Sequence, residues 1–120
     1  METEWVARIV SFVVMVAAGV LLVWIADAAA SGRLERNHLA GIRVSTTMAS
    51  EEAWLAAHVR ARRQTIYAGT VGVVGGAFAL VPVPMPVVTI GVLVAAFGMI
   101  GFVLYGARVG SAAAKSAAEF

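Results

Sequence analysis

Apolar residues fill three stretches of the chain, and one long polar stretch separates the first from the second. Residues 9–26 carry no charged side chain, which at about 1.5 Å of rise per residue is long enough for a membrane-spanning helix. By the same criterion we predict spans at about residues 6–29, 64–81 and 87–108. The pattern therefore predicts an all-α integral membrane protein that forms a single domain with three transmembrane helices.

The first apolar stretch resembles both a signal peptide and a transmembrane helix. Small residues follow Asp27, as at a cleavage site, but Glu2 and Glu4 make the leading segment acidic. The apolar run also exceeds the roughly 7–15 residues of a signal-peptide core. We therefore expect an uncleaved span, with Asp27 near its end either solvated or paired with an arginine of the next segment.

Residues 30–63 form the polar loop, and they hold six of the nine basic residues. An excess of arginine and lysine marks the cytoplasmic side of a membrane protein. The turn between the second and third spans is proline-rich and uncharged, which suits the outer face. The sequence thus predicts a cytoplasmic loop, an outer N-terminus and an inner C-terminus.

The composition argues against several classes of function. Apolar residues make up 61% of the chain and charged residues 13%, whereas soluble domains average about 45–50% and 25%. A net charge of +2 gives no reason to expect nucleic acid as a partner, and the lipid bilayer is the expected surroundings. The chain has no cysteine, and its two histidines lack the spacing of metal ligands. We expect no metal, cofactor or catalytic group; the alternative is a membrane-embedded enzyme that uses Arg43, Glu52 and His58.

Two predicted spans carry small residues at intervals of three or four. Such stripes allow membrane helices to approach closely, and packing then drives their association. We predict that both stripes are helix-packing surfaces, facing either another membrane protein or a second copy of this chain. The residues are Ala68, Gly72, Gly76, Gly91, Ala95 and Gly98.

The second half of the polar loop has the pattern of a helix start. Ser50 followed by Glu51 and Glu52 supplies a cap and first-turn carboxylates that complement exposed N–H groups. Beyond it, one helical face combines Trp54 and His58 with small residues, so we expect this face to pack rather than to contact water. The members of this face are Ala53, Trp54, Ala57, His58 and Ala61.

The loop also carries a spaced motif, N-x3-G-I-R-x3-T-x2-S-E-E-x-W-x3-H, that resembles the signature segment of the SdpI family. Ten residues fall on this pattern: Asn37, Gly41, Ile42, Arg43, Thr47, Ser50, Glu51, Glu52, Trp54 and His58. The resemblance implies a small multi-pass protein of the bacterial inner membrane. It also implies immunity against a secreted peptide toxin, or signalling by capture of a cytoplasmic regulator at the membrane.

Two hypotheses for the polar cluster follow. In one, the cluster recognises a peptide toxin or a regulator, with Trp54 and His58 taking part in the contact. In the other, Arg43 pairs with Glu51 or Glu52 and merely folds the loop. The recognition hypothesis involves Asn37, Gly41, Arg43, Glu51, Glu52, Trp54 and His58.

An alternative function uses the small-residue stripes instead of the loop. In it, the protein is an accessory subunit that packs against a larger membrane complex. The tail at residues 110–120 is alanine-rich and predicts either an exposed helix or disorder, and no function is assigned to it.

Overall fold

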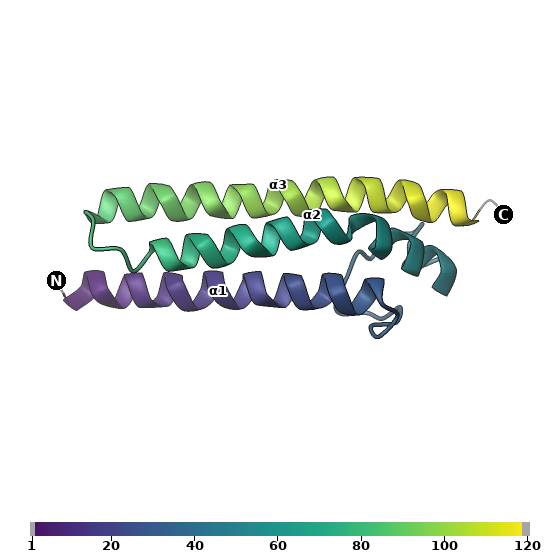
Figure 1. Ribbon diagram of the computed structural model, residues 1–120, viewed down its shortest axis with the longest axis horizontal. Helices are drawn as coiled ribbons and strands as arrows, with labels where there is room; N and C mark the ends of the chain where they lie inside the picture. The colour runs from purple at the N-terminus through teal and green to yellow at the C-terminus, as the bar shows by residue number, and fades with distance from the viewer. Residues whose placement is uncertain (1, 119–120) are drawn as a thin grey trace.

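Three long helices lie side by side in the computed structural model, which describes residues 2–118 (Figure 1). They are α1 (Glu2–Ala30), α2 (Glu51–Phe78) and α3 (Met85–Ala118), and no strand occurs among the described residues. The molecule is a rod of 59 × 21 × 18 Å. Helix α2 packs against both neighbours, whereas α1 and α3 scarcely touch each other. The predicted all-α class is confirmed.

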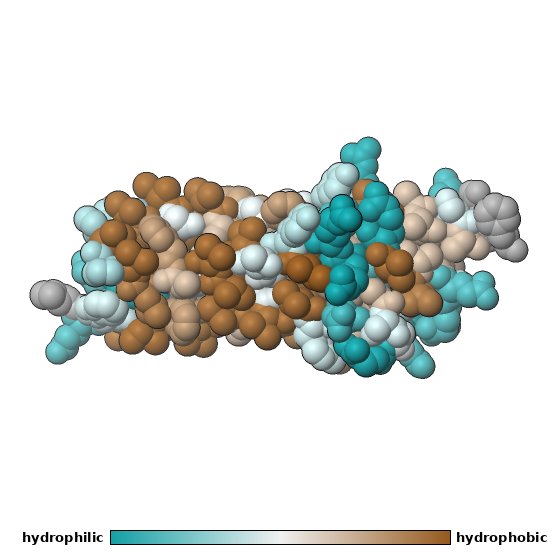
Figure 2. Space-filling model, viewed as in Figure 1, coloured by the Kyte–Doolittle hydropathy of each residue, from teal (hydrophilic) through white to brown (hydrophobic). Residues whose placement is uncertain are grey.

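Helices α1 and α3 are long and apolar enough to cross a membrane. Only 17% of the most apolar window of each is buried, so most of these side chains face outward, unlike those of a core helix in a soluble protein. Figure 2 shows the result as an apolar surface over much of the rod, bounded by a polar band near the loop end. The structure thus has the surface of an integral membrane protein.

Helix α2 differs because its first half is polar. Arg60, Arg62 and Arg63 lie in that half, and the apolar part runs only from Gln64 to Phe78. By length and composition α2 is therefore not among the candidate spans. Its apolar part nevertheless lies between the other two helices (Figure 1). That the chain crosses the membrane three times remains a prediction.

The small residues of α2 lie where the helices approach most closely. A Cβ atom added at Gly72 would lie 2.6 Å from Cε of Met99 on α3 and 3.1 Å from Cα of Gly19 on α1. One added at Gly76 would lie 2.7 Å from Cγ2 of Val16, and Ala68 is fully buried. The α2 stripe is therefore covered by the chain's own helices.

The stripe on α3 faces α2. Gly91 lies against the ring of Phe78, Ala95 is buried, and a Cβ atom at Gly98 would be 3.5 Å from Cγ1 of Val71. The α3 stripe thus packs against Val71, Gly75 and Phe78 of α2, beside the α2 stripe rather than on it.

The turn between α2 and α3 contacts a charged residue that the sequence analysis did not connect with it. Arg8 of α1, only 5% exposed, donates from Nη1 to the carbonyl oxygen of Val81 at 2.7 Å and from Nη2 to that of Val83. Its guanidinium also lies 5.4 Å from the ring centroid of Trp5. The uncharged turn is thereby fastened to the start of α1.

Helices α1 and α3 extend beyond the predicted spans at both ends, whereas α2 ends at Phe78 and so falls short of the predicted end at residue 81. Helix α3 runs to Ala118 instead of ending near Arg108, so the described part of the tail is helical. The reason is packing: Ala114 is fully buried in a cluster with Ala53 and Ala57 of α2. The end of the tail, residues 119–120, lies outside the described residues.

Candidate recognition site in the loop between the first two helices

The loop at residues 31–50 folds over the polar end of the rod, where Asp27 links three segments. Its Oδ2 accepts a hydrogen bond from Nη2 of Arg33 at 2.7 Å, and its Oδ1 one from Nη2 of Arg62 at 3.3 Å. Of the two expectations for Asp27, pairing with arginines is the one observed. These two bonds join the end of α1 to the loop and to α2.

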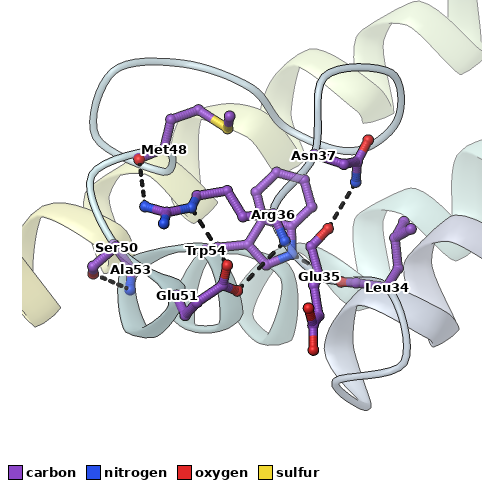
Figure 3. Close-up of polar contacts among 9 residues, drawn as sticks. All are labelled: Leu34, Glu35, Arg36, Asn37, Met48, Ser50, Glu51, Ala53 and Trp54. Atoms are coloured by element: carbon purple, nitrogen blue, oxygen red, sulfur yellow. Dashed lines mark hydrogen bonds and ion pairs between the residues drawn. The ribbon is translucent and has the colours of Figure 1, made fainter.

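Trp54 is the main side chain beneath the loop. It is only 1% exposed, and its indole Nε1–H donates to the carbonyl oxygen of Leu34 at 2.9 Å (Figure 3). A buried indole needs such a partner, because an unpaired donor inside a protein is costly. Trp54 therefore fixes the first part of the loop to α2.

His58 lies one turn further along α2 and holds the second part of the loop. It is 4% exposed, and its ring centroid is 4.2 Å from that of Trp54. Nε2 is 2.9 Å from the backbone nitrogen of Ile42, and Nδ1 is 2.8 Å from the carbonyl oxygen of Trp54. The neutral ring with its proton on Nδ1 satisfies both partners.

The protonation of His58 is linked to this geometry. Burial lowers the pKa of His58 below its ordinary value of 6.5, and the hydrogen bond to the Trp54 carbonyl opposes that effect only in part. A second proton on Nε2 would face the N–H group of Ile42, so that bond would be lost. The folded loop therefore requires neutral His58.

Gly41 passes directly over the two rings. Its φ of 103° lies in a region that favours glycine. A Cβ atom here would lie 2.6 Å from Cη2 of Trp54 and 2.8 Å from Nε2 of His58. Position 41 of the motif therefore needs glycine because its φ is positive and because a Cβ atom has no room there.

Two further motif residues satisfy the loop's backbone. Thr47 is fully buried; its Oγ1 donates to the carbonyl oxygen of Ile42 at 2.6 Å and accepts from the N–H of Val44 at 3.1 Å. Asn37 Oδ1 accepts from the N–H groups of Leu39 and Ala40, both at 2.8 Å. These contacts close two local turns in a segment without regular structure.

The acidic residues of the motif do not pair as predicted. Glu51 Oε1 lies 3.4 Å from Nε of Arg36, whose Nη1 donates to the carbonyl oxygen of Met48 at 2.9 Å (Figure 3). Within residues 2–118, Arg43 forms neither an ion pair nor a hydrogen bond, and it is exposed. The hypothesis that Arg43 pairs with Glu51 or Glu52 is therefore wrong.

The loop consequently has an inner layer and an outer surface. The inner layer is enclosed, and it consists of Gly41, Thr47, Trp54 and His58. We expected Trp54 and His58 to contact a partner. The structure corrects this expectation, because both side chains are buried and hold the loop in place. The outer surface consists of exposed residues, with Leu39 at 91% and Val44 at 44%. Its members are Leu39, Arg43, Val44 and Ser45.

Leu39 was missed by the sequence analysis. The available signal was an apolar leucine two residues after Asn37 in an otherwise polar loop, since an asparagine side chain often closes a short turn. Beneath the outer loop surface lies a largely apolar cavity of about 330 Å³, bounded by Leu39 and Ile42 of the loop and by Leu22 and Val103 of the helices.

The groups of the site that could react or bind a metal ion include the two ring nitrogens of His58 and the acidic residues of the loop. Both ring nitrogens of His58 are engaged by backbone groups, so the ring has no free site for proton transfer. Among the described residues, no three histidine, cysteine or acidic side chains lie close enough to hold a metal ion. The site offers contacts for binding.

An apolar bundle of helices with a folded polar loop at one end defines the class: a small integral membrane protein with an exposed loop surface. The model of the SdpI/YfhL protein family matches residues 33–106, more than half of the chain, and the chain belongs to this family. The matched part begins in the loop, includes all of α2 and ends within α3. No curated protein and no solved structure shows a significant match.

Proposed function

We propose that this chain is an SdpI-like immunity or signalling protein of the bacterial inner membrane, and that its outer loop surface recognises the partner. The partner is a peptide toxin or a cytoplasmic regulator. The observation that carries this proposal is the division of the loop. Its buried residues hold a fixed shape, and that shape leaves Leu39 and Arg43 exposed without a structural task.

The charge distribution supports a cytoplasmic loop. Eight of the nine basic residues lie in the loop, on the first half of α2 or toward the end of α3, where Gly110 contacts Ala57. The ninth, Arg8, lies at the opposite end and is covered by backbone carbonyl groups. Positive side chains of this kind remain on the cytoplasmic side. With three crossings, the N-terminus is outside and the C-terminus inside.

The chemistry of the outer loop surface favours a peptide ligand. Leu39 offers an apolar contact, and Arg43 offers a planar guanidinium that binds a carboxylate with two parallel hydrogen bonds. The apolar cavity beneath Leu39 has room for one apolar side chain of the partner. A peptide with an apolar residue beside an acidic group or a free carboxyl end fits this surface. The role is one of binding without catalysis.

The accessory-subunit hypothesis relied on the small-residue stripes as outward-facing surfaces. The α2 stripe contacts the chain's own helices, with Gly72 against Met99 and Gly76 against Val16. The α3 stripe packs against α2 and also lines an open apolar groove of about 560 Å³ beside it. Because nothing in the structure indicates what covers this groove, we do not propose that function.

The test measures survival of a toxin-sensitive bacterium that produces this protein and is exposed to the family's secreted peptide toxin. We expect the wild type to protect, and the double variant Leu39→Ala, Arg43→Ala to lose protection while its amount and melting temperature stay unchanged. Lys115→Ala, an exposed change on α3, is the control and should protect fully. Full protection by the double variant would contradict a recognition role for this surface.

A further inference from the structure

The outer face of the first half of α2 carries a hollow of about 860 Å³. It lies away from the helical face that packs beneath the loop, where Ala53, Trp54 and Ala57 are buried. The hollow extends from Glu52 at one end to Gln64 at the other, and arginines and apolar residues line it between these ends. None of these residues belongs to the outer loop surface described above.

Its charge is positive and only partly neutralised by the described residues. Arg60 and Arg63 are exposed and form no ion pair or hydrogen bond with the described residues, whereas Arg62 is held by Asp27. Glu52 is the acidic residue of the lining, and it lies eight positions before Arg60, or about 12 Å along the helix. The Gln64 end of the hollow therefore attracts an anion.

The lining is also apolar. Leu55 and Val59, one helical turn apart, are 41% and 57% exposed and lie beside the arginines. Gln64 is the residue at which the apolar part of α2 begins, so the hollow ends where the helix becomes apolar. A soluble anion would contact the arginines alone, but a phospholipid brings a charged headgroup and an acyl chain together.

We propose that this hollow binds the headgroup of an anionic phospholipid of the surrounding leaflet, with Arg60 and Arg63 contacting its phosphate and its acyl chains extending along the apolar part of α2 that begins at Gln64. Basic side chains at the start of membrane helices bind anionic lipid by this electrostatic attraction. The lipid would fix the depth and tilt of α2, and through Trp54 and His58 on its opposite face it would steady the loop.

The test uses the full-length protein in detergent, mixed with phosphatidylglycerol or phosphatidylcholine, and counts bound lipid by native mass spectrometry. The wild type should retain phosphatidylglycerol in preference to phosphatidylcholine. The double variant Arg60→Gln, Arg63→Gln should bind phosphatidylglycerol roughly tenfold or more weakly, as expected for the loss of two phosphate contacts. The double variant Arg108→Gln, Lys115→Gln removes the same charge from α3 and should bind within about twofold of the wild type.

Three outcomes would overturn the proposal: equal retention of the two lipids, equal losses in the two double variants, or displacement of phosphatidylglycerol by equimolar inorganic phosphate. The last would indicate a small-anion site. Because the substituted side chains are exposed, both double variants should have the melting temperature of the wild type. If the Arg60→Gln, Arg63→Gln variant melts at a lower temperature, the single variant Arg63→Gln takes its place in the test.

Discussion

At the scale of single residues, the loop depends on three groups that meet in one place: the backbone of Gly41 and the rings of Trp54 and His58. A helical face combining Trp54 and His58 was predictable from their spacing of four. That Gly41 would lie against both rings was not, because the sequence does not determine the path of an irregular loop. Trp54 and His58, whose chemistry suggested recognition, therefore lie buried and hold the loop backbone.

Gly41→Ala should lower the melting temperature substantially. The left-handed backbone costs a residue with a Cβ on the order of 1–3 kcal/mol, and the new atom also overlaps the rings of Trp54 and His58. Gly32→Ala is a matched control, because Gly32 also has positive φ, 85°, but no atom lies within 4 Å of an added Cβ. Thermal melting in detergent compares the two. Equal losses would show that contact with the rings contributes nothing.

The loop should open as the pH falls. Because folding lowers the pKa of His58, the open loop binds a proton more tightly than the closed loop does. The stabilisation is complete above about pH 6.5, the ordinary value, and is lost as the pH falls toward the lower pKa of the folded state. The protection factor of the Ile42 amide, which donates to Nε2 of His58, should therefore be lower at pH 5 than at pH 7.5, the protection factor being the intrinsic exchange rate at each pH divided by the observed rate.

Two variants separate this effect from general acid sensitivity. His58→Gln should remove the pH dependence, whereas His38→Gln, at the exposed second histidine, should retain it. If the exchange of Ile42 responds to pH in the same way in both variants, His58 is not the titrating group.

At the scale of helices, close packing along α2 explains why this helix is rich in small residues. Gly72→Leu should lower the melting temperature by several degrees, since overpacking costs about 1–3 kcal/mol, while insertion into the membrane is retained. Gly101→Leu, on α3 with nothing within 4 Å of an added Cβ, is the control and should be nearly neutral. Similar melting of the two variants would mean that the contact between Gly72 and Met99 is not tight in the membrane.

Hydrophobic pattern alone predicted the three helices, because long uncharged stretches leave few alternatives. It predicted their ends less well. Helix α3 extends past Arg108 because Ala114 finds a packing surface on α2, and only the tertiary structure provides that surface. Ion pairs show the same limit. Arg36 and Arg43 both lie in the loop that precedes Glu51, so the sequence does not decide which of them pairs with it. The path of the loop brings Arg36 to Glu51.

At the scale of the whole molecule, the two ends of the rod differ in chemistry. One end has the short turn that Arg8 fastens to α1, and the other has the loop with nearly all the basic residues. Such asymmetry orients a protein in the membrane. In the orientation that we propose, the outer loop surface lies on the side where a cytoplasmic regulator, or a toxin that has entered the membrane, would meet it.

The sidedness of the loop is the claim on which the rest depends, and cysteine labelling measures it directly. The chain has no cysteine, so Ser45→Cys on the outer loop surface and Met85→Cys at the opposite end each report without background. With a membrane-impermeant maleimide, we expect Met85→Cys to react in intact cells and Ser45→Cys to react only after the membrane is opened. Labelling of Ser45→Cys but not Met85→Cys in intact cells would place the loop outside and contradict the account.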